Sequence, residues 1–218
     1  MSFVETIVVE FLAEHLYERL NSQHWLIERL KDHPLTAEDH PMPDYEPILD
    51  RLILIDREFQ IFVETKYQDR FTELTEPLIT RLKNGSKQKY YDAFKSIADE
   101  LFSTGVSWTR IVTFLVYSAE LINKVIELPN QKDKEKTFKM VSQIISCVCR
   151  YFDENLLQWI NEQDGGWENI IEYTKGLNHN YGMNADNGSG RGLKQYIGVA
   201  AFAVVIGGLY LCAKLTVQ

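Results

Sequence analysis

The stretch TRIVTFLVYSAELINKVIEL, residues 109–128, places apolar side chains on every face of a helix. A helix that is apolar all round belongs inside a bundle, because none of its sides is suited to water. The sequence therefore predicts that the rest of the chain packs around residues 109–128.

Apolar residues on both sides of this stretch recur at intervals of three and four, the spacing of one helix face. The pattern predicts helices over residues 3–20, 24–30, 48–74, 90–102, 138–156 and 167–173, with Pro77 resetting the chain after the third. No stretch alternates for long with the two-residue period of a strand. The expected fold is all-α, a bundle of about seven or eight helices around the central one.

Proline and glycine divide this bundle. Residues 32–47 hold four of the six prolines, so we expect a loop there, since proline breaks a helix interior and cannot donate in a sheet. Gly105 is expected to end the helix before the central one, with Ser107 capping the central helix. Gly165 and Gly166 should stop the long helix that follows it.

The C-terminal segment YIGVAAFAVVIGGLYLCA, residues 196–213, carries no charge, and its length meets the threshold for a membrane span. Tyr196 and Tyr210 lie near its ends, where aromatic rings favour the interface. Only residues 214–218 follow, so we expect a tail anchor, although a buried core helix is the alternative. Residues 178–195, rich in Asn and Gly, would be a flexible tether, and residues 1–177 the bundle.

Composition narrows the class of protein. The chain has 23 Lys and Arg against 31 Asp and Glu, a net charge of −8, which argues against binding nucleic acid. Hydrophobic residues make up 45% and aromatic residues 12%, enough for one compact core. Three cysteines cannot form a secreted disulfide framework, and acidic residues at positions 5, 10 and 14 do not fit a secretion signal. A cytosolic location fits best.

Nothing in the sequence indicates catalysis. The five histidines lack the i, i+4 spacing of a helical zinc pair, and we expect them to be ordinary surface residues. Cys147 has no neighbouring base, so it and Cys149 are expected to be buried structural thiols. Adjacent carboxylates such as Asp99 and Glu100 diverge on a helix. We therefore expect no enzyme activity, no cofactor and no metal site.

Two segments are more specific than generic helix. ELFSTGVSWTRIVTFL, residues 100–115, and WINEQDGGWENIIEY, residues 159–173, resemble the first and second homology segments of the Bcl-2 family of apoptosis regulators. ETIVVEFLAEHL, residues 5–16, resembles the fourth segment, common in pro-survival members. Ser107 and Thr109 depart from the family's usual Asn and Gly, and one extra residue lies between Trp159 and Gly165. The resemblance covers nearly the whole chain.

The family's third homology segment would fall on residues 48–59, with its apolar positions at Ile48, Leu52, Ile55 and Phe59. Here the chain departs further from the pattern. Asp56 and Arg57 stand where the pattern has Gly and Asp, and only Glu58 keeps its place. The chain is therefore identified as a diverged member.

The resemblance implies a surface groove that accepts an amphipathic helix from a pro-apoptotic relative, namely that relative's third homology segment. Such a groove needs apolar pockets and a charge that sets the register. Arg110 is the candidate charge, because a guanidinium can hold a partner Asp with two hydrogen bonds. The other candidates, any of which could instead be core, are Phe59, Phe62, Phe94, Ile97, Leu101, Ser107, Trp108, Thr109, Val112 and Tyr117. Trp108, Trp159 and Trp167 are favoured as packing anchors.

A pro-apoptotic member would insert its own third segment into a relative's groove. In this chain that would set Arg57 against the relative's arginine, a contact between like charges. Together with the fourth-type segment at residues 5–16, the resemblance therefore implies a pro-survival protein at the cytosolic face of the mitochondrial outer membrane, with the endoplasmic reticulum also compatible and with homo- or heterodimers allowed. One alternative is a pro-apoptotic pore former that inserts helices such as residues 109–128. Another is a tail-anchored adaptor without a groove.

Overall fold

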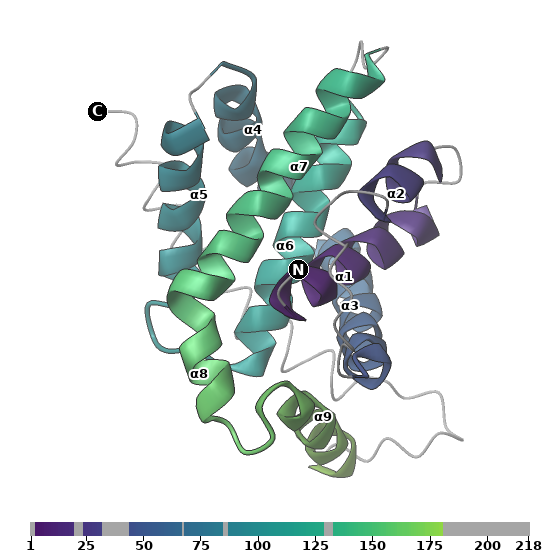
Figure 1. The fold of residues 1–218 in the computed structure, drawn as a ribbon, viewed down its shortest axis with the longest axis vertical. Helices are drawn as coiled ribbons and strands as arrows, with labels where there is room; N and C mark the ends of the chain where they lie inside the picture. Colours follow the sequence, from purple (N-terminus) through teal and green to yellow (C-terminus); the bar gives the residue numbers. More distant parts are fainter. Residues whose placement is uncertain are drawn as a thin grey trace.

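The computed structural model describes residues 3–19, 24–31, 44–66, 68–84, 87–128 and 133–180. All regular structure in these ranges is helical (Figure 1). The predicted all-α fold is therefore confirmed for this part of the chain.

Nine α-helices follow one another along the described part of the chain. In order they are α1 (Phe3–Arg19), α2 (His24–Lys31), α3 (Glu46–Lys66), α4 (Gln68–Asn84), α5 (Lys87–Leu101), α6 (Trp108–Ile126), α7 (Lys134–Tyr151), α8 (Leu157–Glu162) and α9 (Asn169–Asn180). A π-helical turn, Phe152–Leu156, joins α7 to α8, and a 3-10 turn, Gly166–Glu168, precedes α9.

Helix α6 is the centre of the bundle, as its sequence predicts. Every residue from Ile111 to Ala119 is buried, which requires neighbours on all sides. Those neighbours are α1, α3, α4, α5 and α7 (Figure 1). Burial of large apolar side chains stabilises the fold by about 1.5–3 kcal/mol each, and α6 contributes more of them than any other described helix.

Helix α1 forms a second internal element. Its stripe of Val4, Ile7, Phe11, Leu12 and Leu16 is almost fully buried. The helix packs against α2, α3, α6 and α7, so the first helix of the chain is held by four others.

Pro77 does not reset the chain, contrary to the sequence-based prediction. The structure describes α3 as far as Lys66 and α4 from Gln68 to Asn84, and Pro77 lies inside α4. A proline inside a helix removes one backbone hydrogen bond. Pro77 itself is exposed.

The predicted loop is shorter at its C-terminal end, because Glu46 and Pro47 belong to the first turn of α3. Proline is tolerated there, since the first N–H groups of a helix have no intrahelical acceptor. Residues 32–43 of that loop lie outside the described residues.

The predicted stop after the long helix is confirmed. Gly165 and Gly166 have φ values of 81° and 57°, a left-handed conformation that glycine adopts without strain. They turn the chain from α8 into α9. That last helix reaches Asn180, three residues beyond the predicted end of the bundle at 177.

The rest of the predicted tether and the whole predicted anchor, residues 181–213, lie outside the described residues. Among the helices that are described, none combines the length and the apolar character needed to cross a membrane.

Candidate functional site

The corner between α5 and α6, residues 102–110, has the local structure that its sequence predicts. Gly105 takes a φ of 109° and ends the turn that follows α5. Ser107 is extended, and its hydroxyl accepts a hydrogen bond from the backbone N–H of Arg110 at 3.4 Å. This is the N-cap that starts α6, and it places Arg110 in the first helical turn.

Arg110 folds back over this corner. Its guanidinium donates to the carbonyl oxygen of Gly105 and to the hydroxyl of Thr104. Both acceptors are neutral, and no carboxylate among the described side chains pairs with Arg110. The side chain is partly exposed, so its charge remains available to a carboxylate from outside.

Trp108 joins the two segments that carry the family resemblance. Its indole N–H donates to Asn169 Oδ1 at 2.9 Å, and its ring lies 5.5 Å from Trp159 and 5.8 Å from Trp167, centroid to centroid. Beside it, the hydroxyls of Thr109 and Tyr173 are hydrogen-bonded. Trp108 is buried, so these contacts pack α6 against the α8–α9 end of the bundle.

Most of the apolar groove candidates whose side chains the structure describes are buried. Phe94, Leu101, Val112 and Tyr117 are buried along the α5–α6 interface, and Ile97 is partly buried. Phe59 and Phe62 belong to α3, but their side chains lie outside the described residues. A partner helix could reach the four buried side chains only if whatever covers them moves.

A buried polar cluster lies elsewhere on α6, where α1 and α3 pack against it (Figure 1). His15 Nδ1 of α1 lies 2.8 Å from Asp56 Oδ2 of α3, and both residues are 1% exposed. On the other side of the ring, Nε2 lies 3.5 Å from Glu120 Oε1 and 3.3 Å from Asn123 Nδ2, both of α6. We call these four residues the histidine cluster.

Two opposing effects set the pKa of His15. Burial by itself lowers the pKa of His15, but hydrogen bonds and charge attraction from Asp56 and Glu120 outweigh it and raise the pKa to about 9. The ring is therefore cationic at neutral pH. Its Nδ1–H then donates to Asp56 and its Nε2–H is available to Glu120.

The sequence-based prediction that the histidines are ordinary surface residues is wrong for His15. The signal was present, because His15 sits beside Leu12 and Leu16 on an otherwise apolar face, and Asp56 follows Ile55 on another. Two opposite charges on two buried faces indicate a pair, yet they are 41 residues apart and only the fold shows that they meet.

A family model described as "Apoptosis regulator proteins, Bcl-2 family" matches residues 62–167, which include the corner, Trp108 and the turn at Gly165. This chain belongs to the Bcl-2 family. The match begins after Asp56, so α1 and the first part of α3 lie outside it.

Similarity to individual Bcl-2 family proteins agrees with this assignment. The chain is 29% identical over 152 residues to Bcl-2-like protein 1 of Homo sapiens, covering 70% of this chain and 57% of that protein. It is 31% identical over 140 residues to apoptosis regulator R11 of Xenopus laevis, covering 64% and 57%. Over 81 residues it is 25% identical to the Bcl-2-related ovarian killer protein of Homo sapiens, covering 37% and 34%. The chain thus matches little more than half the length of the first two relatives.

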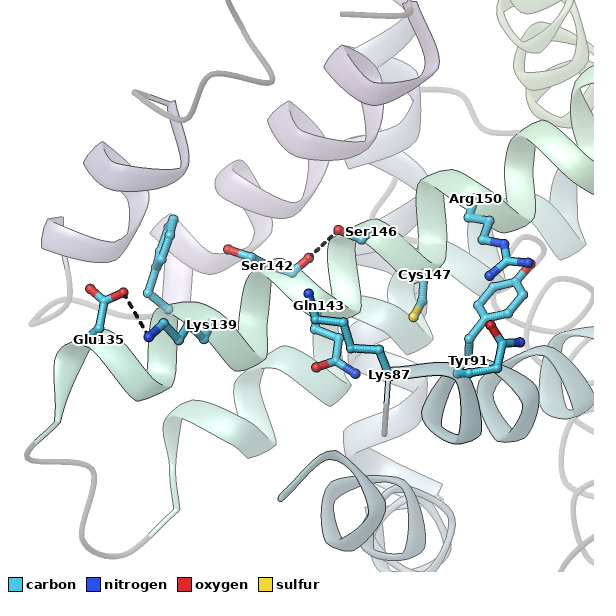
Figure 2. A pocket seen from close by; sticks show the side chains of 11 residues that line it. Lys87, Tyr91, Glu135, Lys139, Ser142, Gln143, Ser146, Cys147 and Arg150 are labelled. Carbon is cyan, nitrogen blue, oxygen red and sulfur yellow. Dashed lines mark hydrogen bonds and ion pairs between the residues drawn. The ribbon is translucent and has the colours of Figure 1, made fainter. Parts of the chain in front are cut away.

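A pocket of about 710 Å³ lies between α5 and α7 of this Bcl-2 family chain (Figure 2). Three cations line it, and two are engaged, because Arg150 donates to Glu154 at 2.7 Å and Lys139 lies 3.7 Å from Glu135. The lining residues are Lys87, Gln88, Tyr91, Glu135, Phe138, Lys139, Ser142, Gln143, Ser146, Cys147 and Arg150. None of them is a predicted groove residue.

The thiols behave as the sequence predicts. Cys147 and Cys149 are both free and buried, and burial raises the pKa of each to about 12. Neither is a reactive thiolate at neutral pH. Among the described side chains, no three His, Cys, Asp or Glu residues gather in a group that could hold a metal ion.

Proposed function

We propose that this protein is a pro-survival member of the Bcl-2 family that sequesters amphipathic death-motif helices of pro-apoptotic relatives in a surface groove beside Arg110. The proposal rests on the position and the hydrogen-bond partners of Arg110. It is fixed in the first turn of α6 and partly exposed, and its described partners are only a carbonyl and a hydroxyl.

Such an arginine suits an aspartate from a partner. A guanidinium can exchange two neutral acceptors for one carboxylate that takes two parallel, charge-assisted hydrogen bonds, which are stronger than neutral ones. The N-cap at Ser107 and the turn at Gly105 hold the backbone of Arg110 in place before the partner arrives. Preorganisation of this kind lowers the entropy cost of binding.

The apolar side of the groove would form by movement, because Phe94, Leu101, Val112 and Tyr117 are buried in this structure. Binding would therefore open the surface along α5, and its cost would reduce the affinity relative to an open groove.

The residues of α3 favour a protein that binds a partner's helix over one that inserts its own α3 into a partner. Asp56 faces inward onto His15, and Arg57 occupies the position where a death motif has Asp. A released α3 would carry a like charge towards a relative's arginine. We further propose that residues 196–213 anchor the protein at the mitochondrial outer membrane, with the endoplasmic reticulum as a second compatible membrane.

The alternative function, a pro-apoptotic pore former of the mitochondrial outer membrane, has one observation in its favour. The chain shares 25% identity over 81 residues with a protein whose name includes "killer". An effector would permeabilise liposomes, and an inhibitor alone would leave them intact.

The proposal is tested by calorimetric titration of the full chain with peptides carrying the LxxxGD death motif, together with dye release from liposomes. We expect submicromolar binding, a loss of at least tenfold in Arg110→Glu, and no dye release. Lys139→Glu is the matched control, because it makes the same charge change in the α5–α7 pocket. No binding across the peptide panel would remove the proposed function, and dye release by the protein alone would favour the effector.

A further inference from the structure

We propose that His15 is a positioning residue that clamps α3 onto α1 and α6 through its buried pair with Asp56. The clamp holds α3 in the bundle. It also fixes the position of this helix, which forms one wall of the proposed groove. The part of this inference that concerns the groove rests on the proposed function. The part that concerns the clamp does not.

The geometry makes the clamp a three-helix joint. His15 comes from α1, Asp56 from α3, and Glu120 from α6. Each pair of these helices is also in direct contact. The imidazole is thus the group through which one side chain of α3 is tied to two other helices.

The pair specifies the register of α3. Successive residues of a helix are about 100° apart, so a one-residue rotation or slip would turn Asp56 away from His15. Such a slip would leave a buried carboxylate and a buried imidazolium without each other, which is costly at a site closed to water. Apolar neighbours such as Leu52 and Ile55 could repack after a slip, but the ion pair could not.

The clamp acts close to the predicted groove wall. Phe59 and Phe62 follow Asp56 by three and six residues on the same helix, so fixing Asp56 fixes the helical backbone one and two turns further on. The clamp also explains why Asp56 can stand where the family pattern has Gly. The carboxylate is matched inside its own bundle, whereas the apolar groove of a relative would offer it no imidazolium.

Three variants test the clamp. Asp56→Asn keeps the shape and removes the charge. Asp56→Gly restores the residue of the family pattern. The double variant His15→Met with Asp56→Leu fills the site with apolar side chains, a replacement that can keep overall stability while removing the ion pair.

The primary readout is hydrogen exchange of the α3 backbone amides in the full chain from pH 7 to 9.5, corrected for the intrinsic rate, with the α7 amides as the internal reference. Peptide titration is carried out on the same samples. His15 is the group whose deprotonation, at a pKa of about 9, would release the clamp, and Asp56 and Glu120 are the carboxylates facing it. A side chain that only fills space would give no such pH profile.

We expect α3 protection relative to α7 to fall at least tenfold in Asp56→Asn and Asp56→Gly at pH 7. In the wild type it should fall at least tenfold as the pH rises through about 9, whereas the double variant should show no fall. The clamp would be overturned if the protection of α3 in the wild type did not depend on pH, or if the double variant showed the same pH profile as the wild type. If the wild type binds no death-motif peptide, the proposed function fails and the exchange data still decide the clamp.

Discussion

Two charged sites lie on the same central helix and differ in how their charges are matched. At the start of α6, Arg110 is partly exposed and its guanidinium donates to a carbonyl and a hydroxyl. Further along, Glu120 and Asn123 face a buried imidazole that is paired with Asp56. The cation of the histidine cluster already faces carboxylates of its own chain, whereas the Arg110 corner could accept a carboxylate from a partner.

This difference separates stability from binding. Removing one partner of a buried ion pair is strongly destabilising, because a charge is left in a site closed to water. Removing an exposed arginine with neutral partners costs the fold little. Changes in the histidine cluster should therefore affect unfolding first, and changes at Arg110 should affect partner binding first.

The largest effect on stability is expected for Asp56→Ala. The free energy of unfolding at pH 7 should fall by about 3 kcal/mol, because the His15 imidazolium loses its nearest counter-charge. Urea unfolding of the full chain measures it. Lys95→Ala, which breaks the exposed pair with Asp99, is the control, with a loss of about 0.5 kcal/mol. Equal losses in the two variants would contradict the account.

The pH dependence of stability should have a defined sign. The folded pKa of His15, about 9, lies above its ordinary value of 6.5, so its contribution is fully present below pH 6.5 and is lost as the pH rises through about 9. The free energy of unfolding should decline by about 2 kcal/mol from pH 6.5 to 8.5. Urea unfolding across this range should show a flatter profile for His15→Gln. A parallel decline in that variant would show that another group is responsible.

At the corner, Ser107→Ala is expected to have a smaller effect. The first turn of α6 loses its N-cap hydrogen bond, which costs about 1 kcal/mol. Thermal unfolding measures the loss, and Ser103→Ala, in the exposed turn that follows α5, serves as the control with no expected change. A loss as large as that of Asp56→Ala would mean that the corner, too, is chiefly structural.

The smallest change in stability is expected for Arg110→Gln, within about 0.5 kcal/mol of the wild type by urea unfolding. Both hydrogen bonds of Arg110 go to exposed neutral groups, which water can satisfy in its absence. A loss above about 2 kcal/mol would place Arg110 among the structural residues and remove the contrast.

Local patterns predicted most of the fold because they act over one helix. The three-four spacing located α1, α5, α6 and α7 to within a few residues, and the sequence GVS at 105–107 predicted the corner. Pro77 misled the prediction, since a proline within a helical pattern marks a frequent but not an obligatory helix boundary, and here it lies inside α4. The His15–Asp56 pair could not be predicted from local pattern, because it depends on which faces of α1 and α3 meet.

The site was predictable only in part for the same reason. Arg110 and its cap follow from a six-residue stretch, and their positions are as expected. Phe94, Leu101, Val112 and Tyr117 were named from their apolar spacing, which is the same for a core residue and for a groove wall. Spacing cannot separate these two roles, since both place apolar side chains on one helix face.

The most direct test of the central claim is a charge-reversal cycle between Arg110→Asp in the full chain and an Asp→Arg change in the death motif of the peptide. Each single reversal should weaken binding at least tenfold, measured by calorimetric titration. If Arg110 meets that aspartate, combining the two should restore at least tenfold of the lost affinity. Losses that simply add, with no recovery in the combined reversal, would contradict the account.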